Sequence, residues 1–223
     1  MEFLKFEEMQ YVVRYPKNYI SGERYPVILF LHGAGTRGND IKRLEGNAFF
    51  RLTEQYEEFP FVCVAPLCHS ETWFDQFETL KRFVTMVENA AYTDPERIYL
   101  MGNSMGGYGS WQLAISMPEV FAALVPICGG GMYWDAGRLK KIPVWAFHGD
   151  IDPTVFPEES VKMVEAVNKK GGCAKLTLYP DTKHDSWTPT FNNAEVFTWL
   201  LAQRRYRAEA EADQSYADVK KFG

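Results

Sequence analysis

Apolar residues along this chain fall into short continuous runs, separated by longer segments in which they recur every three or four positions. The runs lie at residues 11–15, 27–31, 61–65, 97–101, 122–127, 144–148 and 176–179. Continuous apolar runs of this length are typical of strands buried on both faces of a parallel sheet. The first run, which Pro16 closes, is predicted to be an edge strand.

Helical spacing follows most of these runs. It predicts helices near residues 40–56, 77–91, 105–116 and 158–169, and a last helix that begins near Pro189 and continues through Leu201. Alternating strands and helices predict an α/β fold, with a mostly parallel sheet and helices on both of its faces. We expect one domain over residues 1–203. Apolar periodicity fades after that point, so residues 204–223 are predicted to be a polar tail or a helix extension.

Composition narrows the class of protein. The chain has 223 residues, of which 46% are hydrophobic and 24% are charged, and these values are typical of a globular domain with its own core. A formal charge of −5 argues against nucleic acid or an anionic membrane as a partner. The N-terminal residues do not resemble a signal peptide, so a cytoplasmic location is expected. The four cysteines form no Cys-x-x-Cys pair, and we expect neither a metal nor a cofactor.

The strongest chemical signal is Gly102-Asn103-Ser104-Met105-Gly106, which lies between a predicted strand and a predicted helix. Gly-x-Ser-x-Gly in that context is the sequence form of a nucleophile elbow, a turn so tight that side chains two positions from the serine would collide. The turn exposes the serine Oγ near the N-terminal end of a helix, where partial positive charge suits an oxyanion. Ser104 is therefore the candidate nucleophile.

A serine nucleophile needs a base, and the base needs an orienting acid; after an elbow serine, the acid precedes the base in the chain. Only His148 and His184 follow Ser104. His148 ends a predicted strand and is expected to be structural, whereas His184 lies in a loop after the last strand and is the predicted base. Asp152 is favoured as the acid because it lies farther from the strand end than Asp150.

Three other acids stay open as alternatives to Asp152. Asp150 is expected to cap the turn, while Asp181 and Asp185 lie close to His184 in sequence. The oxyanion hole is predicted to combine the backbone N–H of Met105 with that of Ala34 in the loop His32-Gly33-Ala34-Gly35, with Gly35 as the near alternative.

These motifs together resemble those of small serine esterases of the α/β-hydrolase fold, of the carboxylesterase/phospholipase type and the prolyl-oligopeptidase-like single-domain type. The segments that carry the resemblance are His32–Gly35, the elbow with Gly106-Gly107, His148–Asp152 and His184–Trp187, and it extends from about residue 25 to residue 200. It implies the same nucleophile, acid, base and oxyanion amides. Asn103 and Thr36-Arg37 depart from the usual family pattern.

The expected function is hydrolysis of carboxylic esters through an acyl-enzyme. The segment between residues 127 and 144 is short, so we expect a minimal lid or none, and an open site for short acyl groups or sugar-linked esters. Trp73, Trp134, Phe156 and Trp187 are candidates for its walls. A peptidase or amidase with the same triad, and a non-catalytic binding protein with this fold, remain alternatives.

Overall fold

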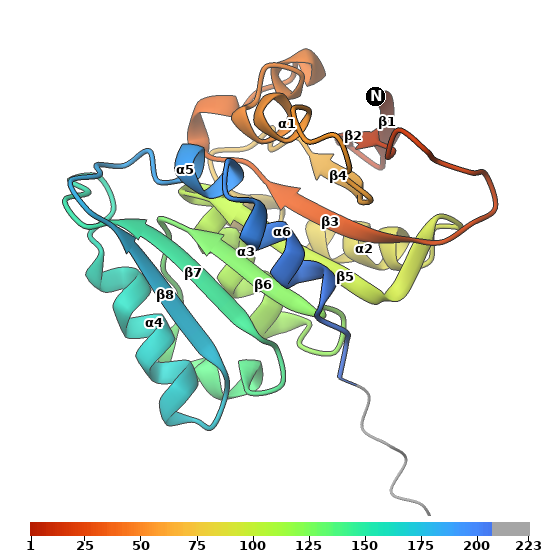
Figure 1. Ribbon diagram of the computed structural model, residues 1–223. Coiled ribbons are helices and arrows are strands. Elements are labelled where there is room, and N and C mark those ends of the chain that lie inside the picture. Colours follow the sequence, from red (N-terminus) through yellow and green to blue (C-terminus); the bar gives the residue numbers. More distant parts are fainter. Residues whose placement is uncertain (207–223) are drawn as a thin grey trace, which may run out of the picture.

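The computed structural model describes residues 1–206. Within this range eight strands form one sheet in the spatial order β1-β2-β4-β3-β5-β6-β7-β8, and helices cover both of its faces (Figure 1). The strands are β1 (Glu2–Phe6), β2 (Met9–Arg14), β3 (Tyr25–Leu31), β4 (Val62–Pro66), β5 (Thr93–Asn103), β6 (Ala123–Ile127), β7 (Val144–Gly149) and β8 (Ala174–Tyr179). The α-helices are α1 (Ala48–Thr53), α2 (Phe77–Glu88), α3 (Met105–Ser116), α4 (Glu158–Lys169), α5 (Trp187–Phe191) and α6 (Ala194–Leu201). Short 3₁₀ helices are η1 (Ala34–Thr36), η2 (Ile41–Leu44), η3 (Trp73–Gln76) and η4 (Tyr133–Leu139).

The sheet is antiparallel at one end and parallel elsewhere. Strand β2 pairs antiparallel with β1 and β4, and every pairing from β4 through β3, β5, β6 and β7 to β8 is parallel. The carboxyl ends of parallel strands lie at one edge of a sheet, which is where open α/β sheets bind ligands. The loops that follow β3, β5, β7 and β8 therefore meet, although they are far apart in sequence.

Each central strand contributes to two cores, one on each face of the sheet. In β3, Val27, Leu29 and Leu31 belong to the core beneath α2, α3 and α4, while Ile28 and Phe30 belong to the core beneath α1, α5 and α6. Figure 1 shows these two sets of helices on opposite sides of the strands. Because neighbouring side chains of a strand point to opposite faces, a strand between two cores has to be continuously apolar.

The predicted fold class is confirmed, and the structure corrects three predicted elements. Strand β1 was not predicted, and since it pairs with β2, the run at residues 11–15 is not an edge strand. The helix predicted over residues 40–56 is two short helices, η2 and α1, because the side chain of Asn47 accepts a hydrogen bond from Phe49 N and begins a new helix. The last predicted helix is also divided: Asn193 caps α6 separately from α5.

The end of the chain lies partly beyond the described region. Arg205 N donates a 2.8 Å hydrogen bond to Glu96 O, which holds the chain against the start of β5. The rest of the predicted tail, residues 207–223, lies outside the described residues. Among residues 1–206, no helix is long and apolar enough to span a membrane. The cytoplasmic location stays a prediction.

Candidate active site

Ser104 lies between β5 and α3 in a strained backbone conformation, with φ 55° and ψ −120°. Non-glycine residues rarely adopt positive φ, and such strain is concentrated at functional sites. A methyl group on Gly106 would lie 1.9 Å from Leu31 O, and one on Gly102 would lie 2.4 Å from Gly106 O. Both glycines are therefore required by the close approach of backbone segments, as the elbow pattern predicts.

The structure brings Ser104, His184 and Asp152 into one hydrogen-bonded line. Ser104 Oγ lies 2.9 Å from His184 Nε2, and His184 Nδ1 lies 2.7 Å from Asp152 Oδ2. A carboxylate only accepts hydrogen bonds, so Nδ1 carries the ring proton and Nε2 is free to accept the serine proton. This tautomer is the one that a serine nucleophile requires of its base.

Asp152 is only 2% exposed, and its loop supplies the remaining hydrogen-bond donors. Oδ1 accepts hydrogen bonds from Thr154 N at 2.8 Å and from Val155 N at 3.1 Å. Burial by itself raises the pKa of the Asp152 carboxyl, but the bond from His184 and the two backbone amides outweigh it and hold the pKa below its usual range. Asp152 is thus a buried, fully hydrogen-bonded carboxylate.

The neighbouring acids lie elsewhere. Asp150 is exposed, and its carboxylate accepts a hydrogen bond from Thr182 N at 3.3 Å, so it supports the turn as predicted. Asp185 accepts hydrogen bonds from the backbone N–H and the hydroxyl of Thr188, at 3.0 and 2.9 Å. Within residues 1–206, Asp152 is the aspartate that is hydrogen-bonded to the His184 ring.

A second Ser–His–Asp series touches the same carboxylate. His148 Nδ1 lies 2.7 Å from Ser160 Oγ, and His148 Nε2 lies 3.3 Å from Asp152 Oδ2. Ser160 and His148 are both fully buried, and Ser160 Oγ also contacts Gly129 O at 2.9 Å. A substrate cannot reach this serine, so His148 is structural, as the sequence predicts, but it contacts the acid directly.

The loop after β3 faces the elbow from the other side. The Gly33 carbonyl points into its own loop, where it accepts hydrogen bonds from Thr36 N at 3.1 Å and from His32 Nδ1 at 2.8 Å. The N–H and C=O of a trans peptide point in opposite directions, so the Ala34 N–H points out of the loop. Met105 is the first residue of α3, and its N–H has no acceptor within the helix. Neither arrangement conflicts with an oxyanion hole, and the assignment of Ala34 and Met105 as its donors stays a prediction.

His32 organises this loop, a role that the sequence analysis did not assign. Its Nε2 accepts a 2.9 Å hydrogen bond from Cys68 N, and its carbonyl accepts a 3.0 Å bond from Trp73 Nε1. Trp73 is 0% exposed, so its prediction as a wall of the site is wrong: the indole lies beneath the loop as part of the core. In the sequence, a histidine directly followed by a glycine at the end of a predicted strand is the signal that could have indicated this role.

Ser104 opens into a cavity of about 670 Å³ on the side of α1 and α5. Among the described residues that line it, only Arg43 carries a permanent charge; the others combine small residues and one tryptophan with uncharged polar side chains, and most of the exposed lining is apolar. The lining residues are Gly33, Ala34, Gly35, Thr36, Arg43, Gly46, Asn47, Ala48, Asn103, Ser104, Thr154, His184 and Trp187. The cleft therefore offers a substrate both apolar surface and several hydrogen-bonding side chains.

The other predicted wall residues differ in position. Trp187 lines the cavity, with its ring edge-to-face against His184 at a centroid distance of 5.3 Å. Trp134 and Phe156 are 67% and 66% exposed and do not belong to that lining. Between β6 and β7 the chain forms only the short helix η4, so no large lid is inserted there.

One group of described residues has the donor atoms of a metal site. Cys128 Sγ and donor atoms of Asp152 and His184 all lie within 4.8 Å of one another. Burial raises the pKa of the Cys128 thiol to about 12, which favours the thiol over the metal-binding thiolate. The other two side chains are hydrogen-bonded to each other. The observed arrangement is therefore that of a serine site rather than a preformed metal site.

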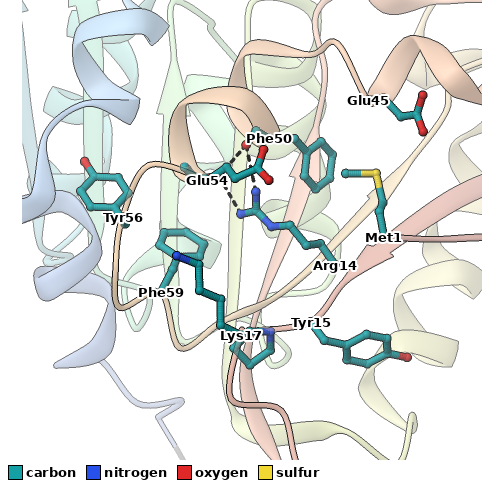
Figure 2. A pocket seen from close by; sticks show the side chains of 11 residues that line it. Met1, Arg14, Tyr15, Lys17, Glu45, Phe50, Glu54, Tyr56 and Phe59 are labelled. Atoms are coloured by element: carbon teal, nitrogen blue, oxygen red, sulfur yellow. Dashed lines mark hydrogen bonds between the residues drawn. The ribbon is translucent and has the colours of Figure 1, made fainter.

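A separate cavity of about 270 Å³ lies beside β2 and α1. Figure 2 shows Arg14 there, with its guanidinium directed at the α1 backbone. Arg14 donates to Phe50 O at 2.9 Å and to Thr53 Oγ1 at 2.6 Å, and it lies 5.2 and 5.3 Å from the ring centres of Phe50 and Phe59. Arg14 thus fastens α1 to the sheet, and the cavity brings no nucleophile or base together.

A mostly parallel sheet between two helical layers, with a strained serine after β5 and its base after the last strand, defines an α/β-hydrolase. A sequence profile of the Dienelactone hydrolase family matches residues 69–222. The chain belongs to the dienelactone hydrolase family, and the resemblance to α/β-hydrolases that the sequence predicted is confirmed.

Individual relatives agree with this assignment. The structure of a thermostable esterase superposes with a TM-score of 0.76 and 31% identity, over 92% of this chain and 62% of that one. A probable feruloyl esterase C of Aspergillus flavus is 22% identical over 76% of this chain and 64% of its own. Dipeptidyl-peptidase 5 of Porphyromonas gingivalis is 20% identical over 82% of this chain but only 33% of its own. The chain thus spans between one third and about two thirds of the length of these relatives.

Proposed function

We propose that this chain is a serine esterase that hydrolyses carboxylic esters through an acyl-enzyme. Ser104 is the nucleophile, His184 the general base and Asp152 the acid that orients it. The observation that carries the proposal is the continuous line from Ser104 Oγ to His184 at 2.9 Å and on to Asp152 at 2.7 Å. Membership in a hydrolase family and the similarity to a thermostable esterase support it.

The first half-reaction forms the acyl-enzyme. Ser104 Oγ attacks the ester carbonyl carbon while its proton moves to His184 Nε2, and the carbonyl π electrons move onto oxygen. The ionised Asp152 stabilises the resulting imidazolium through Nδ1–H. The N–H groups of Ala34 and Met105 donate to the oxyanion, and loss of one such donor typically costs about 3–4 kcal/mol in barrier height. As the carbonyl re-forms, the C–O bond to the alcohol breaks and His184 protonates that alcohol.

The second half-reaction repeats these steps with water. The water oxygen attacks the acyl carbon while His184 takes a proton from that water. His184 then returns the proton to Ser104 Oγ when the carboxylic acid leaves. All proton transfers occur among Ser104, His184, water and the two halves of the ester.

The proposed substrates are esters of short acyl groups or esters linked to a sugar. The open cavity beside Ser104 supports this choice, because the Thr36 hydroxyl, the Asn47 amide and the Arg43 guanidinium in its lining offer hydrogen bonds to hydroxyl groups. Trp187 adds an aromatic surface for a sugar or phenolic ring. The similarity to a probable feruloyl esterase C supports a phenolic acyl group joined to a sugar.

A peptidase or amidase with the same triad is the second candidate, favoured by the similarity to a dipeptidyl-peptidase 5. An ester and its isosteric amide separate the two activities. For an esterase, kcat/KM for the ester is expected to exceed that for the amide by several orders of magnitude. An amide that is cleaved as rapidly as the ester assigns the chain to the amidases.

Labelling with a fluorophosphonate tests whether Ser104 is the nucleophile at all. We expect wild type and Ser160→Ala to be labelled and Ser104→Ala to remain unlabelled. Ser160 is the matched control because it also belongs to a Ser–His–Asp series but is fully buried. A wild type that is not labelled points to a non-catalytic binding protein.

Chain-length preference tests the proposed substrate class. In a series of p-nitrophenyl esters, kcat/KM is expected to be highest for acetate to butyrate and to fall for longer chains. A hydroxycinnamoyl ester of a pentose is expected to be cleaved with a lower KM than the corresponding methyl ester. A preference for chains of ten carbons or more contradicts the proposal.

A further inference from the structure

His148 contacts the acid of the site without taking part in the serine–histidine line. It is the penultimate residue of β7 and is 0% exposed. Its Nε2 lies 2.9 Å from Val155 O and 3.3 Å from Asp152 Oδ2. The loop that carries the acid therefore folds back over the strand end, and both of its contacts with His148 meet the same ring nitrogen.

The chemistry of the partners fixes the tautomer of His148. A carbonyl and a carboxylate oxygen can only accept hydrogen bonds, so Nε2 carries a proton and donates to them. Burial lowers the pKa of His148, which keeps the ring neutral and leaves Nδ1 as an acceptor. The Ser160 hydroxyl on α4 lies 2.7 Å from Nδ1 and 2.9 Å from Gly129 O, and a neutral ring that carries its proton on Nε2 requires the single hydroxyl proton to point at Nδ1. The ring is thus held from α4 and directed at the acid loop.

These contacts close a ring of interactions around Asp152. His148 binds the carbonyl of Val155, and the N–H of Val155 donates to Asp152 Oδ1 at 3.1 Å. Asp152 Oδ2 then faces two imidazoles, that of His184 at 2.7 Å and that of His148 at 3.3 Å. A neutral ring at this position restrains the carboxylate without adding a second positive charge that would compete with the imidazolium formed on His184.

We propose that His148 is a positioning residue of the esterase: its Nε2–H holds the Val155 carbonyl and Asp152 Oδ2 so that the carboxylate stays aligned with His184 Nδ1. This inference rests on the proposed function of Ser104, His184 and Asp152. His148 touches neither the substrate nor the reacting atoms. Its effect passes through the orientation of the acid, and therefore through the readiness of His184 to accept the serine proton.

The test compares two amide replacements that differ in where they place a donor. In His148→Gln the side-chain nitrogen can take the place of Nε2, whereas in His148→Asn it reaches only the place of Nδ1, toward Ser160. We expect kcat for a p-nitrophenyl ester to fall about 10- to 100-fold in His148→Asn, with KM changed by no more than about twofold, and to be largely restored in His148→Gln. Ser160→Ala removes the bond to Nδ1 but leaves both Nε2 contacts in place, and its loss of kcat is expected to be smaller than that of His148→Asn.

Thermal unfolding of each variant separates positioning from folding, since the two amide variants remove the same buried ring. Equal kcat in His148→Gln and His148→Asn at similar midpoints overturns the inference, and so does a loss that appears in KM alone. Fluorophosphonate labelling keeps the two proposals apart. Labelled wild type with unchanged kcat in His148→Asn contradicts only the positioning role, whereas unlabelled wild type contradicts the serine esterase itself.

Discussion

His32 Nε2 accepts a hydrogen bond from the backbone N–H of Cys68, at 2.9 Å, and so joins the loop after β3 to the loop after β4. The other ring nitrogen, Nδ1, donates to Gly33 O at 2.8 Å, and that bond fixes the Gly33–Ala34 peptide whose N–H is a predicted oxyanion donor. One neutral imidazole therefore needs one nitrogen as acceptor and the other as donor. The orientation of a predicted oxyanion donor depends on the protonation state of a buried histidine.

This relationship predicts a loss of stability in acid. Burial lowers the pKa of His32 to about 4, below the value of about 6.5 for histidine in an unfolded chain. Between these values the unfolded state binds more protons than the folded state, so the free energy of unfolding falls as pH falls from about 6.5 to 4, by up to about 3 kcal/mol for this group. Urea unfolding at a series of pH values measures the slope.

Two variants test whether His32 causes this pH dependence of the free energy of unfolding. His32→Gln is expected to flatten the pH dependence, because the glutamine amide does not titrate. His69→Gln changes an exposed histidine of the next loop and is expected to leave the slope unchanged. A slope that is the same in wild type and His32→Gln assigns the acid sensitivity to other groups, of which the buried His148 is the first to examine.

Replacement of Gly106 by alanine is predicted to disrupt the elbow. The added methyl would lie 1.9 Å from Leu31 O, an overlap with backbone that no side-chain rotation relieves. We expect the free energy of unfolding to fall by about 3 kcal/mol or more, or the chain not to fold. Gly46→Ala is the matched control, since a methyl there meets nothing within 4 Å. Equal midpoints of urea unfolding for the two variants contradict the prediction.

Loss of charge at Asp152 is predicted to reduce the rate rather than the affinity. Asp152→Asn keeps the size of the side chain, but its amide can place a donor against His184 Nδ1 and favour the wrong ring tautomer. We expect kcat to fall by about 10³- to 10⁴-fold with little change in KM, as triad logic implies. For Asp150→Asn, in the same loop but exposed, kcat is expected to fall by less than about twofold. A comparable loss in both variants argues against Asp152 as the acid.

Trp187 and Trp134 are predicted to differ in their effect on substrate binding. Trp187 lines the cavity beside Ser104, whereas Trp134 is 67% exposed and outside that lining. Trp187→Ala is expected to raise KM for a hydroxycinnamoyl sugar ester at least about tenfold, a loss of about 1.4 kcal/mol, and to affect p-nitrophenyl acetate less. Trp134→Ala is expected to match wild type with both substrates. A larger rise in KM for Trp134→Ala than for Trp187→Ala places the substrate on the η4 side of the site.

The sequence was sufficient where a local pattern expresses a local constraint. Continuous apolar runs predicted the parallel strands, because a strand between two cores must be apolar on both faces. The spacing of Gly102, Ser104 and Gly106 indicated the elbow because the tight turn lies within five residues, although the backbone that excludes a side chain at Gly106 is that of Leu31. The order of the later loops then selected Asp152 and His184 from a small number of acids and histidines.

Long-range contacts set the limit of that approach. Glu2–Phe6 forms a strand only because β2 lies beside it, and its own residues show no strand-like apolar run. Trp73 looked like a wall of the site, but its indole N–H donates to His32 O, a partner 41 positions away in the chain. Likewise, the contact of His148 with Asp152 depends on how the acid loop folds back over β7.

The sequence by itself therefore determined the class of fold, the elbow and the identity of the residues that a serine hydrolase would use. Only the tertiary structure decided which aromatic side chains reach the cavity and which second histidine contacts the acid. The physical reason is distance along the chain: periodicity and turn sterics act over a few residues, whereas hydrogen bonds such as Cys68 to His32 form only after separate loops meet at one edge of the sheet.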